Sequence, residues 1–216
     1  MTTALSKCYT LAAALIFALE RMIYMAQTLQ QLKESLCDCK NCRLCEGRTN
    51  VVFGEGNPNA RVMFIGEGPG KNEDEQGRPF VGRGGQLLDK MLDAVGLSRE
   101  KNIFIANMVK CRPPENRDPQ PDEMEACLPY LREQVKIIRP RFIVCLGRIS
   151  AQRLISPDFK VTKQHGELYE KNGVLMMGTF HPAAILRNPN QKEPGFEDFL
   201  KLREVIKKEC PEVYNL

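Results

Sequence analysis

Residues 62–70 read VMFIGEGPG, an apolar run that stops abruptly in a turn of glycine and proline. In an α/β protein such a run is typical of a buried parallel strand whose carboxyl end opens into a ligand site. The glycines of this turn let backbone N–H groups approach a ligand where side chains would block them. We therefore expect the ligand of this protein to bind where this strand ends.

Three further segments are apolar throughout and predict strands, at residues 103–109, 142–146 and 174–180. Between the strands, apolar residues recur at helical spacing, over residues 86–95, 122–138 and 196–208. Strands that alternate with helices and lack polar faces indicate a parallel sheet covered on both sides. The predicted fold class is α/β, a three-layer α/β/α sandwich with a central, mostly parallel four-stranded sheet.

The composition is that of a globular protein with one substantial core. The chain has 216 residues, of which 43% are hydrophobic and 27% are charged. A net charge of +4 permits an acidic partner such as nucleic acid but does not require one. The apolar run at residues 9–19 is shorter than the roughly 20 residues that span a bilayer. We expect residues 1–24 to be an extension upstream of the true start, followed by a single monomeric, cytoplasmic domain at 25–216 without a membrane partner.

Residues 66–85 are rich in glycine and predict one long loop of functional importance. A Walker A loop ends in Gly-Lys-Ser/Thr, but Asn72 follows Gly70 and Lys71 here. A dinucleotide fingerprint has the spacing G-x-G-x-x-G, whereas this loop has G-x-G-x-G. Both phosphate-binding interpretations are therefore excluded.

The chain has nine cysteines, too few for a small domain held together by disulfides. Cys39 and Cys42 have the short Cys-x-x-Cys spacing of metal ligands, and Cys111 and Cys127 follow farther along the chain. Four thiolates suit either a tetrahedral zinc ion or a 4Fe-4S cluster, and the spacing does not decide between them. Cys45 forms a competing pair with Cys42.

Unusual side chains occur at or near three of the predicted strand ends. Asn107 lies just inside the second strand, and His181, one of two histidines, follows the fourth. Phe80, in the glycine-rich loop, is either a core residue or a platform on which a flat ligand stacks. Because carboxyl ends of parallel strands meet at one edge of a sheet, we expect these segments to converge.

Taken together, these motifs resemble those of the family 4 uracil-DNA glycosylases, an iron–sulfur-containing family. The resemblance covers about residues 36–209. Its motifs are GEGPGKNED at residues 66–74, GRPFVG at 77–82, NMVKCRPP at 107–114 and HPAAILRN at 181–188. Four motifs in this order are highly specific, whereas each alone would be weak evidence.

The resemblance implies a role for each residue around the base. Phe80 would stack on a uracil that has been extruded from the DNA. Asn107 would pair its amide with uracil O4 and N3–H, which disfavours cytosine because the edge of that base is reversed. Glu73 would crowd ring carbon C5 and exclude the thymine methyl group. The base would also be held at the first motif, by Gly66, Glu67 and Gly68.

The resemblance also implies how the bond is broken. His181 would donate to uracil O2 as negative charge builds on the departing base. Family 1 enzymes have an aspartate at the third position of the first motif, which is Gly68 here, so Glu67 is the candidate for orienting the attacking water. Leu186 and Arg187 would contact the minor groove and a phosphate, although Leu186 could instead belong to the core.

The resemblance selects the cluster ligands as well. The family motif C-x-x-C-R-L-x-E-G-R matches residues 39–48, which leaves Cys45 at a variable position. A 4Fe-4S cluster would then be held by Cys39, Cys42, Cys111 and Cys127. The implied activity is removal of uracil from single- or double-stranded DNA, leaving an abasic site. The alternatives are a DNA-binding module with a structural metal, related to phage polymerase domains, and an iron–sulfur electron-transfer protein.

Overall fold

The computed structural model describes residues 28–215, and these contain one six-stranded sheet in the order β1-β3-β2-β4-β6-β5. Its centre is parallel and consists of the predicted strands: β2 (Val62–Gly66), β3 (Ile103–Asn107), β4 (Phe142–Leu146) and β6 (Val174–Thr179). The prediction of a four-stranded sheet is wrong at both edges. There β1 (Glu55–Gly56) and β5 (Leu168–Lys171) pair antiparallel with β3 and β6. One edge strand is two residues long and the other is mostly exposed, so neither has an apolar signal.

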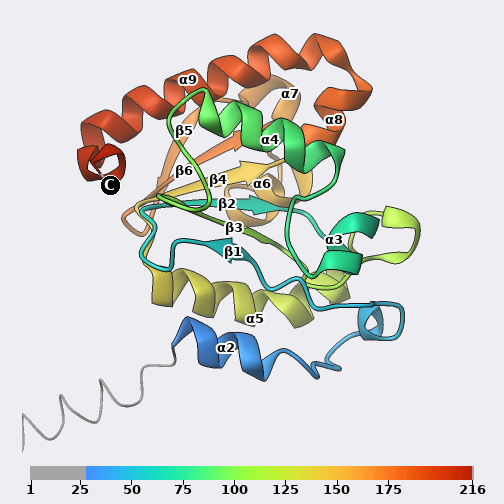
Figure 1. Cartoon of the computed structure of the whole chain (residues 1–216). Coiled ribbons are helices and arrows are strands. Elements are labelled where there is room, and N and C mark those ends of the chain that lie inside the picture. The colour runs from blue at the N-terminus through green and yellow to red at the C-terminus, as the bar shows by residue number, and fades with distance from the viewer. Residues whose placement is uncertain (1–27, 216) are drawn as a thin grey trace, which may run out of the picture.

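Helices cover both faces of the sheet, as the sequence predicts (Figure 1). On one face lie α4 (Arg83–Asp93), α8 (Pro182–Arg187) and α9 (Lys192–Glu209), which contact one another. On the other face lies α5 (Pro121–Ile138), with α2 (Leu29–Ser35) packed against it. Two short helices, α6 (Arg148–Leu154) and α7 (Val161–Gln164), complete the crossover between β4 and β5.

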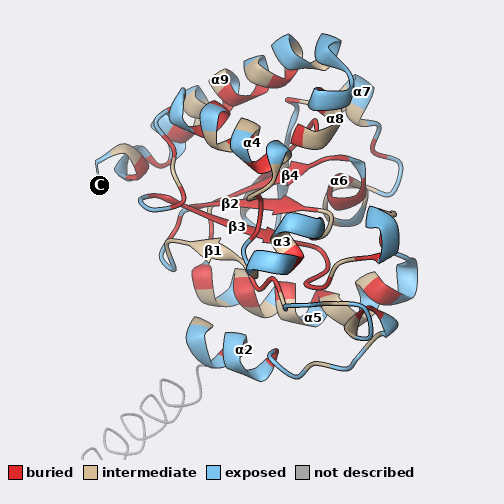
Figure 2. Ribbon diagram, turned by 45° about the vertical axis from the view of Figure 1, so that its right-hand side comes forward, coloured by how far each residue is buried: buried red, intermediate tan, exposed pale blue. Residues whose placement is uncertain are grey.

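The core lies on both sides of the central strands (Figure 2). Strands β2, β3 and β4 are buried along their whole length, and β6 is buried over its last four residues. Successive side chains of a strand point to opposite faces. Accordingly, Val62 and Phe64 pack on the side of α4 and α9, whereas Met63 and Ile65 pack on the side of α2 and α5. This two-sided burial explains why the strands are apolar at every position and why their periodicity is weak.

The glycine-rich segment is not one long loop, because helix α3 (Lys71–Gln76) lies inside it. The helix begins after Gly70, whose N–H donates to the Glu73 carboxylate (3.1 Å). It ends at Gly77, which has a φ of 68°, in the left-handed region that favours glycine. Lysine, asparagine and acidic residues give this short, mostly exposed helix no apolar periodicity, which is why the sequence does not reveal it.

The expected extension at residues 1–24 lies outside the described residues. Within 28–215 no helix is both long and apolar enough to cross a membrane.

Candidate functional site

A pocket lies beyond the carboxyl ends of the parallel strands and brings the predicted site residues together. It is lined by residues from segments distant in the sequence: Glu67, Gly68, Glu73, Phe80, Asn107, His181 and Arg187. Arg187 ends helix α8, and each of the others follows or ends a strand or belongs to the segment between β2 and α4. The predicted convergence at this edge of the sheet is confirmed.

Gly66 allows the Phe80 ring and the Asn107 amide to lie close to the backbone of β2. A Cβ atom there would lie 2.5 Å from Asn107 Oδ1 and 2.5 Å from Phe80 Cζ. Only a residue without a side chain therefore fits between the aromatic ring and the amide. Asn107 is 1% exposed, and its Oδ1 has no hydrogen-bond partner among residues 28–215. A buried acceptor without a partner is costly, so this atom is ready to receive a donor from a ligand.

Glu73 lines the pocket and also holds the turn that follows Phe80. Its Oε1 accepts from the N–H groups of Val81 (2.9 Å) and Gly82 (2.7 Å). With Gly70 on the other oxygen, the carboxylate connects the start of α3 with the segment before α4. These backbone contacts are a feature that the sequence does not reveal.

His181 is oriented by the start of α8. Its Nδ1 accepts from the N–H of Ala183 (3.2 Å), so the ring proton of the neutral imidazole resides on Nε2. Burial, together with the nearby positive charge of Arg187, lowers the pKa of His181 to about 4. The imidazole is therefore neutral near pH 7 and can act as a hydrogen-bond donor through Nε2. Its ring lies 5.7 Å from that of Phe80, measured between centroids.

Glu67 lines the pocket beside Gly147. Burial raises the pKa of its carboxyl group, an effect opposed by the N–H of Ile149, which donates to Oε1 (3.3 Å). Gly147 has a φ of 97°, and a Cβ atom there would lie 2.6 Å from the same oxygen. The close approach of the β4–α6 turn therefore depends on this glycine.

Helix α8 presents the predicted DNA contacts at the edge of the pocket. Leu186 is 41% exposed, whereas its neighbour Ile185 is 3% exposed and belongs to the core. Arg187 lines the pocket, whose rim also carries four more basic side chains: Lys71, Arg83, Arg117 and Arg148. An exposed apolar side chain beside a basic rim suits contact with a nucleic acid.

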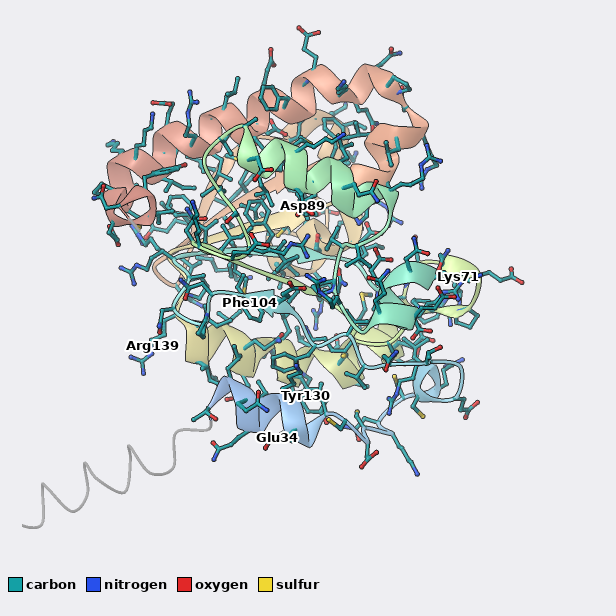
Figure 3. All side chains as sticks on the ribbon, in the orientation of Figure 1. Glu34, Lys71, Asp89, Phe104, Tyr130 and Arg139 are labelled. Carbon is teal, nitrogen blue, oxygen red and sulfur yellow. The ribbon has the colours of Figure 1, made fainter. Side chains whose placement is uncertain are left out.

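A second hollow, between the segment after α2 and the start of α5, is lined by Cys39, Cys42, Cys45, Cys111 and Cys127. Tyr130 projects from α5 on the side of α2, with its hydroxyl 3.7 Å from Cys39 Sγ (Figure 3). Within residues 28–215 no three potential ligands are arranged to hold a single metal ion.

Hydrogen-bond donors around this hollow point at sulfur. Arg48 Nη1 donates to Cys111 Sγ (3.4 Å), and the N–H of Lys110 donates to Cys127 Sγ (3.3 Å). Burial raises the pKa of the Cys127 thiol to about 11, and Lys110 opposes this increase. Donors of this kind suit thiolates that carry negative charge on a cluster. The cysteine set therefore fits a thiolate-bound metal centre.

Lys110 connects the two sites, and sequence reasoning did not single it out. Its fully buried ammonium group donates to the backbone oxygen of Asn107 (2.9 Å) and to Gln134 Oε1 (2.7 Å). Burial lowers the pKa of Lys110 to about 8. Its position in NMVKCRPP, three residues after Asn107 and directly before Cys111, is the sequence feature that could have pointed to it.

Comparison with known proteins agrees with this arrangement. A family model described as the uracil DNA glycosylase superfamily matches residues 53–204. The type-4 uracil-DNA glycosylase of Sulfurisphaera tokodaii is 48% identical over 187 residues, covering 82% of this chain and 84% of the relative. That of Archaeoglobus fulgidus is 41% identical over 197 residues, covering 88% and 98%. A DNA polymerase of Bacillus phage SP01 is 28% identical over 168 residues, but these are 18% of the polymerase.

The fold, the pocket and the family match define the class of protein: the chain belongs to the uracil DNA glycosylase superfamily. Within that superfamily it belongs with the type-4 uracil-DNA glycosylases, since their similarity extends over most of both chains. The resemblance drawn from the motifs is therefore confirmed.

Proposed function

We infer that this protein is a uracil-DNA glycosylase, which hydrolyses the bond between uracil and deoxyribose and leaves an abasic site. The observation that carries this assignment is Asn107 Oδ1, a buried acceptor without a partner that lies beside the ring of Phe80. The family match and the type-4 relatives support the same activity. The non-catalytic DNA-binding alternative is not favoured, because such a module has no need of this acceptor together with His181.

Uracil enters the pocket after it leaves the base stack, since the bond to be cleaved is inaccessible inside a duplex. The Phe80 ring supplies a stacking surface, and Asn107 Oδ1 receives uracil N3–H. Cytosine presents an acceptor at the same ring position, so two acceptors would face each other without a proton. Cytosine is therefore rejected in favour of uracil, because bound cytosine would leave Asn107 Oδ1 without a hydrogen-bond donor. Glu73 lines the wall at which we place ring carbon C5.

The leaving base becomes negatively charged as the glycosidic bond breaks. His181 is neutral and carries its proton on Nε2, so it can donate to uracil O2 without giving up that proton. Such a donor, fixed before the reaction, stabilises charge that develops in the transition state. The sugar becomes oxocarbenium-like, by analogy with the hydrolysis of O-glycosides.

Glu67 is our candidate for orienting the water that attacks the sugar. It is the acidic side chain of the β2 turn, and no carboxylate is available at Gly68. Its ionised form accepts from the attacking water, whereas its protonated form does so poorly.

The cysteine-lined hollow would hold a 4Fe-4S cluster through Cys39, Cys42, Cys111 and Cys127. The cluster would supply a structural crosslink between the segment after α2, the β3–α5 loop and α5. Arg48 and the backbone of Lys110 would donate hydrogen bonds to its thiolates. Cys45 lines the same hollow and stays outside our proposed ligand set.

DNA would approach the basic rim of the pocket, with Leu186 entering the minor groove and Arg187 contacting a phosphate. An apolar side chain inserted at the vacated position keeps the base extruded at the cost of unstacking. We further propose that the protein acts as a monomer in the cytoplasm, with uracil-containing DNA as its partner.

The assignment is tested by incubating the iron-containing protein with a uracil-bearing single-stranded oligonucleotide and then cleaving abasic sites with alkali. We expect strand cleavage at the uracil position and none with a thymine or cytosine control. A His181→Ala variant should retain its iron and lose activity by about 100-fold or more, since one donor to a developing oxyanion supplies that much. Intact, iron-loaded protein that leaves uracil in the DNA would refute the assignment.

A further inference from the structure

Phe80 has a backbone conformation that residues with a side chain rarely adopt. Its φ is 53°, in the left-handed region. In this conformation its carbonyl group approaches α4 so closely that a Cβ atom on Gly85 would lie 1.9 Å from the carbonyl oxygen. Such a conformation persists only when surrounding contacts hold it. The contacts around Phe80 therefore determine where its ring lies.

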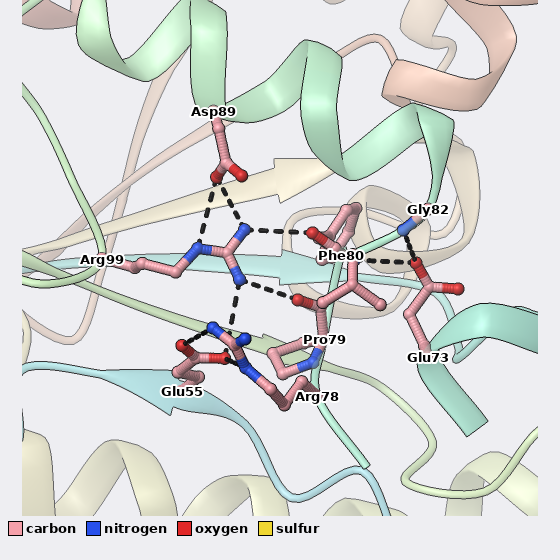
Figure 4. Close-up of polar contacts among 9 residues, drawn as sticks. Glu55, Glu73, Arg78, Pro79, Phe80, Gly82, Asp89 and Arg99 are labelled. Atoms are coloured by element: carbon pink, nitrogen blue, oxygen red, sulfur yellow. Dashed lines mark hydrogen bonds and ion pairs between the residues drawn. The ribbon is translucent and has the colours of Figure 1, made fainter. Parts of the chain in front are cut away.

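Arg99 supplies those contacts from the turn between α4 and β3 (Figure 4). Its guanidinium Nη1 donates to the backbone oxygen of Pro79 (2.8 Å), and Nη2 donates to that of Phe80 (3.1 Å). The Arg99 side chain is only 6% exposed. One rigid planar group thus holds two consecutive carbonyl groups at the point where the backbone is strained.

Asp89 compensates the buried charge of Arg99. Its Oδ1, on helix α4, accepts from Nη2 (2.6 Å) and Nε (3.2 Å) of the guanidinium. Glu55 lies 3.7 Å from Nη1, and Arg78 holds the same carboxylate from the solvent side. Because a buried charge is tolerated only when it is paired, these carboxylates let Arg99 remain inside.

Glu73 accepts hydrogen bonds from the N–H groups of Val81 and Gly82, which come directly after Phe80. The backbone around Phe80 is therefore held by Arg99 on one side and by Glu73 on the other. Arg99, Asp89 and Glu55 are absent from the lining of the pocket. Any effect of Arg99 on a bound base is therefore indirect, and Phe80 is the residue that both accepts from Arg99 and lines the pocket.

We propose that Arg99 is a positioning residue that fixes the Phe80 ring as the surface on which the uracil base stacks. The inference rests on the proposed function, since it presumes that Phe80 stacks on uracil. Neutralising Arg99 releases the carbonyl groups of Pro79 and Phe80, and the backbone relaxes toward negative φ. The ring then leaves its place beside Asn107, and the free base binds less tightly.

The test is inhibition by free uracil, which reports on the stacking surface without requiring DNA binding. In Arg99→Gln we expect the inhibition constant to rise about tenfold, as befits the loss of charged hydrogen bonds. Circular dichroism and iron content should match the unmodified protein. Arg78→Gln is the matched control, because Arg78 pairs with Glu55 and makes no contact with either carbonyl group. It should leave the inhibition constant within about twofold.

A double-mutant cycle separates positioning from a general structural role. In a Phe80→Ala background the ring is absent, so Arg99→Gln should weaken uracil inhibition no further. If Arg99→Gln fails to fold, Asp89→Asn takes its place, because it removes the counter-charge from a partly exposed position. The same non-additivity is expected for Asp89→Asn.

An unchanged inhibition constant, or an equal loss with and without Phe80, would overturn the proposal. Failure of the unmodified protein to excise uracil would instead refute the proposed function, so the two failures are distinguishable.

Discussion

At the scale of single residues, the site consists of groups whose hydrogen bonding, protonation or size is tightly constrained by their surroundings. Asn107 Oδ1 is buried without a partner among residues 28–215, and His181 is held neutral with its proton on Nε2. Gly66 contributes by having no side chain, since any Cβ atom would occupy the space between Phe80 and Asn107. The missing partner of Asn107, the missing charge of His181 and the missing side chain of Gly66 therefore matter as much as the contacts of these residues.

Replacing Asn107 by aspartate tests whether this side chain recognises uracil by hydrogen bonding. The carboxylate keeps the acceptor oxygens but has no N–H to donate to uracil O4, and its charge would be buried. We expect kcat/KM on uracil-containing DNA to fall at least about 100-fold, with iron retained. Asn215→Asp, at an exposed position near the carboxyl terminus, is the matched control and should be neutral. Near-normal activity of Asn107→Asp would contradict the recognition scheme.

The raised pKa of Glu67 predicts a pH dependence of the reaction. Burial disfavours the carboxylate, so the ionised form becomes dominant only at a higher pH than for an exposed glutamate. If that form orients the water, kcat should rise with pH through the raised pKa of Glu67 and then level off. In Glu67→Gln this rise should disappear. A profile of Glu67→Gln parallel to that of the unmodified protein would exclude Glu67 as the titrating group.

At the scale of elements, the end of β6 is tied to α9 behind the pocket. Asp198 on α9 is 5% exposed and accepts from Thr179 Oγ1 (2.5 Å), while His165 Nδ1 lies 2.9 Å from its other oxygen. The His165 ring also packs against Phe180, with 4.5 Å between the centroids. Phe180 directly precedes His181, so this network supports the strand end from which the imidazole projects. His165, to which the sequence assigned nothing, therefore has a structural place.

Asp198→Ala should destabilise the protein more than it alters the chemistry. Removing this buried acceptor leaves Thr179 and His165 unsatisfied, a loss of about 2 kcal/mol in the free energy of unfolding. For a chain of this size the melting temperature should fall by about 4–8 °C. Calorimetry provides the measurement, with the exposed Asp158→Asn as control. A melting temperature within about 1 °C of the unmodified value would show that the network contributes little.

At the scale of the whole molecule, the cysteine hollow and the pocket lie on either side of one short segment. Lys110 donates from its backbone to Cys127 Sγ and from its ammonium group to the Asn107 carbonyl oxygen. We therefore expect changes at the cysteines to reach Asn107 through Lys110. The proposed cluster would then affect catalysis without redox turnover.

Removal of iron should accordingly weaken uracil binding before the sheet unfolds. In Cys127→Ala we expect loss of the brown colour and of iron, and an increase of about tenfold or more in KM, because Asn107 loses its support. Far-ultraviolet circular dichroism should change little. Cys37→Ser is the control, since Cys37 is exposed and does not line the hollow. An iron-free Cys127→Ala protein with unaltered KM would show that the two sites are independent.

The apolar pattern of the sequence was enough to predict the four parallel strands and most of the longer helices, because their burial on both faces leaves no other place for such runs. It failed for β1, β5 and α3, which are short, partly exposed and stabilised by pairing or capping rather than by apolar burial. Their existence depends on partners that are distant in the chain or on single backbone contacts. Such partners become visible only after the chain has folded.

The sequence by itself determined the site in outline: the glycine turn, Phe80, Asn107, His181 and the cysteines that gather in one hollow. The tertiary structure alone decided how these groups are held. Arg99 reaches the Phe80 carbonyl from beyond α4, and Lys110 connects Asn107 with Cys127. The physical reason is that burial, proton position and backbone strain depend on neighbours in space, whereas a motif records only neighbours along the chain.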